Sequence, residues 1–185
     1  MNNLLCTFAL AAICLLPGCS TTDTSNELVA RKTNRVLILT ALYVDPNIDT
    51  VGFNKLTDSV TQEFSSQLRP KLLAAKKKPI NVNDKTLKHS VGEKLAIHAT
   101  TTDAETAVIL SIDSSEVKGQ YTISLKAQYV DLRYKLQNGI TSYVIPTNGF
   151  ERLYYLSGPQ GETAVSPEVY ASKFIADLKA AGRLP

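Results

Sequence analysis

The pattern of apolar and polar positions predicts a sheet in which strands alternate with helices. Residues Arg35–Val44 form a nearly continuous apolar run, which is typical of a central strand buried on both faces. Thr106–Ile112 predicts a second buried strand of the same kind. Pro79–Asn83 alternates between polar and apolar residues and predicts a short strand, placed at a sheet edge because proline cannot donate to a ladder.

Three segments have the period of an amphipathic helix. Asn54 to Ala75 carries an apolar residue at every fourth position, which predicts a helix with Asn54 as its N-cap. Pro70 should kink or end that helix, because it removes a backbone donor and crowds the preceding turn. Asp84 to Thr100 has a weaker repeat and predicts a second helix. The third begins at Ser166–Glu168, where an N-cap serine precedes a proline and an acid.

The longest predicted strand leads into the strongest turn signal of the chain. Gln120–Leu136 alternates with one polar face as far as Tyr129, and a bulge there would explain why the phase then slips. Asn138-Gly139 favours a type I′ hairpin. The partner strand is predicted over Ile140–Ile145, ended by a proline, with a further short strand over Glu151–Leu156.

The N-terminus predicts a secretory signal. Residues 4–16 are apolar apart from Thr7. As a helix this run spans about 20 Å, which is too short for a hydrocarbon core of about 30 Å. Met1–Asn3 carries no Lys or Arg, where a positive charge is usual. We nevertheless predict that residues 1–18 are a signal peptide and are removed.

Residues Leu16-Pro17-Gly18-Cys19 resemble the lipobox of bacterial lipoproteins, Leu-x-(Gly/Ala)-Cys. The resemblance implies cleavage after Gly18, a diacylglycerol thioether on Cys19, and an acylated amino group. Ser20 rather than Asp follows the cysteine, which by resemblance to enterobacterial sorting favours the outer membrane. The alternative is an ordinary secretory peptide in which Cys19 occurs by chance.

Composition and charge narrow the classes of function. Cys6 and Cys14 leave with the signal and Cys19 carries the lipid, so the mature chain keeps no thiol for a disulfide, a metal or a nucleophile. The net charge of +3 is too weak to argue for nucleic acid. Residues 19–34 predict a lipidated cysteine and a flexible tether, and 35–185 a single domain. The predicted fold class is α/β (α+β), with a single mixed sheet, a C-terminal hairpin and helices packed on the sheet.

His89 and His98 are the only histidines. One helix would not bring both to one metal ion, and no carboxylate cluster lies beside them, so we interpret them as surface residues. No Gly-x-Ser-x-Gly, Ser-x-x-Lys or phosphate-loop motif occurs in a fitting context. We therefore predict no catalytic residue, no metal and no cofactor, and we expect that the chain is not an enzyme.

Basic residues concentrate in one part of the sequence, opposed there only by Asp84 and Glu93. One interpretation is a basic face directed at anionic lipid headgroups, lipopolysaccharide phosphates or an acidic protein partner. The interpretation we prefer from sequence is a solvated helix end, whose lysines favour the carbonyl terminus. The residues concerned are Arg69, Lys71, Lys76, Lys77, Lys78, Lys85, Lys88 and Lys94.

Aromatic residues concentrate in the hairpin region. Packing in the core and between strands explains them first, and a partner-binding sheet face or edge is the alternative. They are Tyr121, Tyr129, Tyr134, Tyr143, Phe150, Tyr154 and Tyr155.

The stretch Asp103–Ile112, after the second predicted helix, is similar to the pattern Ala-Asp-Ala-Val-Leu-x-Gly-Ser of α/β envelope lipoproteins, although it lacks the glycine. These include the curli-secretion lipoprotein, the peptidoglycan-synthase activator lipoproteins and the N-terminal domain of the Tol-system β-propeller protein. The resemblance implies a non-enzymatic scaffold or regulator.

Three functions therefore remain as hypotheses. The leading one is a periplasmic lipoprotein, anchored to the outer membrane, that acts as an assembly, scaffold or regulatory subunit with an envelope protein partner. A lipid- or glycan-binding module is the alternative. An envelope enzyme is a third possibility, against which the shortage of His and Cys argues.

Overall fold

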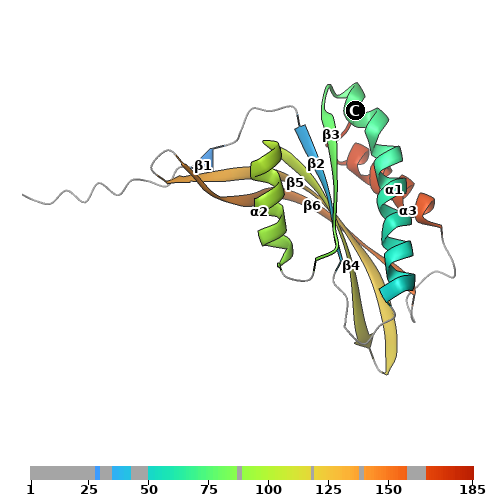
Figure 1. Ribbon diagram of the computed structural model, residues 1–185. Helices are drawn as coiled ribbons and strands as arrows, with labels where there is room; N and C mark the ends of the chain where they lie inside the picture. The colour runs from blue at the N-terminus through green and yellow to red at the C-terminus, as the bar shows by residue number, and fades with distance from the viewer. Residues whose placement is uncertain are drawn as a thin grey trace, which may run out of the picture.

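The computed structural model describes residues 28–29, 35–42, 50–86, 89–117, 119–137, 140–157 and 166–185. Within these residues, six strands form one mixed sheet and three helices pack against it (Figure 1). This architecture confirms the predicted α/β class. Gly18 and Cys19, with the whole predicted signal peptide, lie outside the described residues.

The elements alternate along the chain much as the hydrophobic pattern predicts. The strands are β1 Leu28–Val29, β2 Arg35–Leu42, β3 Lys78–Asp84, β4 Thr106–Val117, β5 Gln120–Gln137 and β6 Ile140–Ser157. The helices are α1 Thr50–Ala74, α2 Val91–Thr102 and α3 Pro167–Ala180.

β2 is the central strand, paired in parallel with β3 on one side and with β4 on the other. β4 pairs antiparallel with β5, and β5 pairs antiparallel with β6. β1 adds to β5 at Tyr134 and Lys135. Because β6 pairs with the same two residues, β1 must lie along the other edge of β5, the one that β4 uses further along. β2 as a central strand and β3 as an edge strand are both confirmed.

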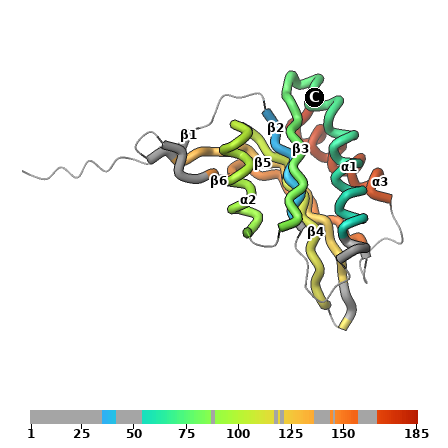
Figure 2. Tube along the Cα trace, in the orientation of Figure 1, coloured from blue at the N-terminus to red at the C-terminus, as the bar shows by residue number. Residues whose placement is uncertain are grey.

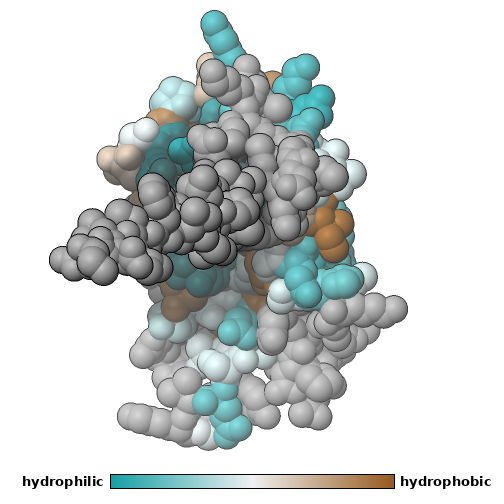
Figure 3. Space-filling model, turned by 90° about the vertical axis from the view of Figure 1, so that its left-hand side faces the viewer, coloured by the Kyte–Doolittle hydropathy of each residue, from teal (hydrophilic) through white to brown (hydrophobic). Residues whose placement is uncertain are grey.

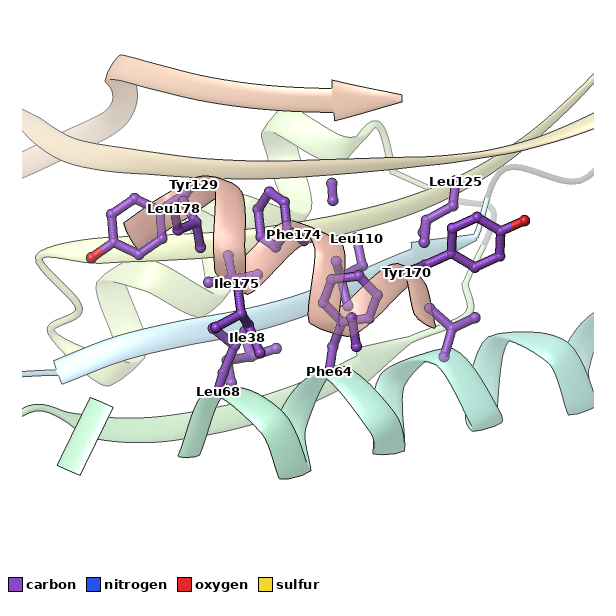
Figure 4. Packing of buried hydrophobic residues seen from close by; sticks show 14 of the residues in the cluster. Ile38, Phe64, Leu68, Leu110, Leu125, Tyr129, Tyr170, Phe174, Ile175 and Leu178 are labelled. Carbon is purple, nitrogen blue, oxygen red and sulfur yellow. The ribbon is translucent and has the colours of Figure 1, made fainter. Parts of the chain in front are cut away.

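The helices cover both faces of the sheet and create two cores. α1 and α3 pack on one face and α2 on the other (Figures 1 and 2). Phe64 of α1 and Phe174 of α3 have ring centroids 5.6 Å apart, in a cluster with Ile38 of β2 and Leu110 of β4 (Figure 4). Leu37, the neighbour of Ile38, belongs to the core under α2. β2 reads as a continuous apolar run because successive residues enter opposite cores.

β5 contributes to the two cores in turn. Up to Tyr129 its buried odd-numbered residues face α1 and α3, and from Val130 its buried even-numbered residues face α2. Its register with β4 is continuous up to Asp131, so β5 itself does not slip. The expected irregularity lies between Tyr129 and Asp131, but the extra residue belongs to β6, where Asn148 has a φ of 50°. The phase change marks the crossing from one helix layer to the other.

α1 differs from its prediction at Asn54 and at Pro70. It begins before Asn54, which is therefore not its N-cap, and it continues through Pro70. Leu68 and Leu72, on either side of Pro70, are fully buried. Ser66, whose carbonyl loses its helical partner, is exposed, so water can bond that carbonyl. Burial of the apolar stripe outweighs the cost of the proline.

β6 also runs further than predicted. It passes through Pro146 to Ser157 and absorbs the separate strand expected over Glu151–Leu156. Proline is tolerated in an edge strand, and β6 pairs only with β5 among the described strands. α2 begins at Val91 rather than near residue 84, and it ends at Thr102.

Candidate functional site

A hollow of about 300 Å³ opens on the α2 side of the sheet, beside the first turn of α2. Val91 of α2 and Leu153 of β6 border it. α2 covers β5 from Val130 onward, and β4 and β5 run on past that helix (Figure 2). The uncovered part of this face carries polar side chains, as the predicted polar face of β5 requires. Those lining the hollow are Ser111, Asp113, Ser124, Lys126 and Gln128.

The Glu151 carboxylate contacts two polar side chains on the β5 side of the hollow. Lys126 Nζ lies 3.0 Å from Glu151 Oε2, and Gln128 Nε2 donates a hydrogen bond of 2.8 Å to the same oxygen. Asp113 is exposed on β4, in register with Ser124. The hollow therefore offers hydroxyl, amide, carboxylate and ammonium groups around an exposed leucine, Leu153. Such a surface suits a hydrogen-bonding ligand or a polar protein segment.

A second polar cluster ties the end of β3 to α2. Lys94 is only 2% exposed, and its Nζ lies 3.4 Å from Asp84 Oδ1 and donates to the Asp84 backbone oxygen at 3.2 Å. The other carboxylate oxygen of Asp84 lies 3.0 Å from His98 Nε2. Thr86 donates to Asp84 Oδ1 from both its backbone nitrogen and its hydroxyl.

These partners decide the ionisation of Asp84. Partial burial opposes its charged form, but hydrogen bonds from Thr86 and His98 and the charge of Lys94 outweigh that cost. The pKa of Asp84 is therefore held well below its usual value. The Asp84 cluster fixes α2 against the sheet, and it explains how a lysine can be buried there.

The structure divides the predicted basic face into separate parts. Lys94 is enclosed with Asp84, and Lys85 pairs with Asp58 at 2.8 Å. Lys77 lies 4.0 Å from Glu105. Lys88 lies outside the described residues. The remaining residues stay together at the end of α1 and the start of β3, and we call them, with one lysine of α3, the basic end: Arg69, Lys71, Lys76, Lys78 and Lys179.

Packing of α1 against α3 brings Lys179 into this group. Both helices end at the same end of the molecule (Figure 1, top). The side chain of Lys71 is within hydrogen-bonding reach of Lys179 and lowers its pKa. Hydrophilic side chains stand at this end in Figure 3 as well. Sequence reasoning missed Lys179 because its neighbour is remote along the chain and the two meet only through tertiary packing.

The two histidines lie in different surroundings. His89 is exposed, with Nδ1 3.9 Å from Glu93, whereas His98 is partly buried against Asp84. The interpretation of both as surface residues is therefore right for His89 and incomplete for His98. Among the described residues, no group of three or more His, Cys, Asp or Glu side chains is placed to hold a metal ion.

Most of the described aromatic residues pack as expected. Tyr129 and Tyr134 are buried in opposite cores, and Phe150 and Tyr154 pack against the cluster that contains Phe174. Tyr155 is partly exposed. The side chains of Tyr121 and Tyr143 lie outside the part of the chain that the structure describes.

Comparisons with known proteins do not assign a family. No protein-family model matches the chain, and no curated protein is significantly similar to it. Within the described residues, no helix is both long enough and apolar enough to cross a membrane.

Solved structures show only a distant likeness to the chain, and a lipoprotein is among them. A PelC dodecamer from Paraburkholderia phytofirmans is 14% identical, with a TM-score of 0.36 over 84% of this chain and 92% of that one. Lipoprotein GNA1162 from Neisseria meningitidis is 10% identical, with a TM-score of 0.34 over 79% and 98%. Hypothetical protein CT253 from Chlamydia trachomatis is 13% identical, with a TM-score of 0.34 over 80% and 95%. At these scores the likeness carries no argument about function or assembly.

Proposed function

We propose that this chain is a lipid-anchored, non-enzymatic subunit of a bacterial envelope assembly, held at the outer membrane with its domain in the periplasm. The observation that carries the proposal is Leu16-Pro17-Gly18-Cys19 at the end of a short N-terminal apolar run. A diacylglycerol thioether with an acylated amino group supplies several acyl chains, each buried CH₂ contributing about 0.8 kcal/mol, which makes a stable anchor.

The hollow is the surface that best fits a protein partner. Leu153 is 48% exposed, and a polar rim that includes Lys126 and Glu151 surrounds it. An exposed apolar side chain inside a polar rim is the usual composition of a protein-binding patch. The partner is expected to insert an apolar side chain beside Leu153 and to hydrogen-bond the rim.

Site-specific crosslinking in living cells tests this assignment. A photoreactive amino acid at Leu153 of the full-length protein should yield a discrete crosslinked species in the envelope fraction. The matched control is Val169 of α3, which is 41% exposed on the other side of the sheet. Crosslinks of equal yield at both positions, or none at Leu153, would contradict a partner in the hollow.

A glycan-binding module is the second candidate, and the lining of the hollow is the observation that favours it. Its volume of about 300 Å³ matches the lower end of ligand pockets, roughly 300–1,000 Å³. Asp113 offers a carboxylate that accepts hydrogen bonds from ligand hydroxyls, and Gln128 offers an amide group. Calorimetry with a soluble peptidoglycan disaccharide should then show binding that Asp113→Ala weakens and Asp58→Ala does not. No measurable heat with the native protein would exclude this candidate.

A further inference from the structure

The basic end gathers positive charge from three elements. α1 ends, β3 begins and α3 ends at one end of the molecule (Figure 1, top). Within the described residues, no carboxylate lies within ion-pair distance of Arg69, Lys76 or Lys78. Lys71 and Lys179 are each other's neighbours rather than partners of an acid. Glu105 lies in the same region but pairs with Lys77, at 4.0 Å, so the five residues of the basic end leave it with a net positive charge.

Helix dipoles explain only part of this patch. Lys71 and Lys179 lie in the last turns of their helices, where a cation is stabilised by the partial negative charge of the carbonyl end. Lys76 and Lys78 lie beyond α1, and Lys76 holds a φ of 58°. Two helix ends supply about one negative charge together. Most of the positive charge at the basic end is therefore left for an external anion.

An exposed leucine lies among these charges. Leu73, in the last turn of α1, is 54% exposed, the largest value among the exposed large apolar residues of the described chain. Lysine and arginine beside an exposed leucine are the composition of surfaces that lie in the headgroup region of a bilayer.

The chain geometry brings the bilayer to the same end of the sheet. Leu28 of β1 follows Cys19 by nine positions, so Cys19 lies within about 30 Å of β1 even when fully extended. Arg35 follows Val29 by six positions, a reach of about 20 Å, and Arg35 is in register with Lys78 of the basic end. By contrast, the turn between β4 and β5 lies about 50 Å along β5 from the β1 contact.

We propose that the basic end docks on the anionic phospholipid headgroups of the bilayer that holds the Cys19 lipid, with Leu73 entering the headgroup layer. The inference rests on the proposed lipid anchor. The acyl chains hold the protein at the membrane, and the basic end sets its orientation. The β4–β5 turn then points away from the bilayer, and the hollow opens on the α2 face of the sheet, with Lys126 about 27 Å along β5 from Tyr134 at the β1 contact.

Two reporter positions test the orientation. The mature chain has no other thiol than Cys19, so Ala74→Cys beside the basic end and Ser115→Cys on β4 each create a unique labelling site, and both positions are exposed. The acylated full-length mature protein is reconstituted into phosphatidylcholine vesicles with and without 30% phosphatidylglycerol. A nitroxide on a fraction of the headgroups quenches a fluorophore on either cysteine.

The expected result is several-fold stronger quenching at Ala74→Cys than at Ser115→Cys in the anionic vesicles. The difference should shrink in 0.5 M salt and in pure phosphatidylcholine, because exposed charges are screened or lose their partner. Arg69→Gln, Lys76→Gln and Lys78→Gln together should abolish it. The control with the same change of charge is Lys55→Gln, Lys85→Gln and Lys173→Gln, which should leave the difference intact.

The outcomes separate this inference from the anchor itself. Two results, on a protein that floats with the vesicles, would overturn the orientation and leave the anchor standing. One is equal quenching at both positions, and the other is a quenching difference that does not depend on headgroup charge. A protein whose mass shows no acylation would overturn the anchor and, with it, the inference.

Discussion

Asp84 lies at the end of β3, where its carboxylate meets an ammonium group that has almost no access to water. Asp84 contacts the Lys94 ammonium twice, with a carboxylate oxygen at 3.4 Å and with its backbone oxygen, which accepts a hydrogen bond at 3.2 Å. A buried charge is tolerated only while its partner is present. The stability of the contact between β3 and α2 therefore depends on one side chain.

Asp84→Asn should destabilise the fold by about 3 kcal/mol, because it leaves the Lys94 ammonium buried without a counter-charge. The free energy of unfolding in urea measures this. Adding Lys94→Met should recover most of the loss, since no uncompensated charge then remains. Asp58→Asn is the matched control, because its pair with Lys85 is on the surface and contributes at most about 1 kcal/mol. Equal losses from Asp84→Asn and Asp58→Asn would refute the role of the cluster.

Because of the same cluster, the free energy of unfolding depends on pH. The pKa of Asp84 is lower in the folded protein than in the unfolded chain, where it is about 3.9. The stability that ionised Asp84 contributes is therefore fully present above about pH 4 to 5 and is lost as the pH falls below that range. The difference in unfolding free energy between native protein and Asp84→Asn should shrink between pH 6 and pH 3. A difference that stays constant across this range would contradict the lowered pKa.

Removal of a tyrosine hydroxyl should lower the stability of the fold at Tyr134 but not at Tyr154. Tyr134 donates to the Ala104 carbonyl and lies 3.3 Å from the Ala99 carbonyl, so Tyr134→Phe should cost about 1 to 2 kcal/mol. The buried Tyr154 hydroxyl has no hydrogen-bond partner within the described residues, so Tyr154→Phe should be neutral or slightly stabilising. Thermal unfolding of the two variants side by side checks both. A larger loss for Tyr154→Phe than for Tyr134→Phe would show the assignment to be wrong.

At the scale of elements, α2 is held by its cap as well as by Lys94. Ser90 accepts from the Glu93 backbone nitrogen, and Glu93 accepts in return from the Ser90 backbone nitrogen at 2.8 Å. This is a capping box. Ser166, the N-cap of α3, has the same extended backbone but makes no side-chain capping bond.

The two caps make a matched pair of substitutions. Ser90→Ala should destabilise the protein by about 1 kcal/mol, whereas Ser166→Ala should cost only a few tenths, because only the first removes a hydrogen bond. Urea unfolding of both variants against the native chain is the measurement. A cost for Ser166→Ala as large as that for Ser90→Ala would mean that the caps are equivalent.

Where the hydrophobic period coincides with tertiary burial, the elements follow from the sequence. β2 is an example, because Val36 to Leu39 are all fully buried, so both faces of the strand are apolar in the sequence as well. Pro70 and Pro146 are misleading locally, because packing and an edge position compensate for the missing donors. The phase change after Tyr129 is visible in the sequence, but its cause is a change of covering helix, which only the fold reveals.

The candidate sites are less predictable for the same reason. The polar face of β5 is visible as an alternation, yet the hollow exists only because α2 stops short of Lys126 and Gln128. Counting charges cannot tell Lys94, which is buried, from Lys78, which is exposed. Ser90 and Glu93 carried a readable capping signal that a search for apolar period alone passes over.

At the scale of the whole molecule, the sheet has two dissimilar ends. One end carries β1, through which the chain leads back to Cys19, and the basic end lies within reach of it. The other end carries the β4–β5 turn. The proposed lipid anchor would lie at the β1 end, and the hollow lies about 27 Å along β5 from the β1 contact. This arrangement would suit a module that presents a partner-binding surface to the periplasm.

The lipid on Cys19 is the central claim, and the intact mass of the protein extracted from membranes tests it most directly. We predict a chain that begins at Cys19 and carries a diacylglycerol and an amide-linked acyl group, and a precursor that accumulates when globomycin blocks the lipoprotein signal peptidase. A secreted protein with a free thiol at Cys19 would contradict the account.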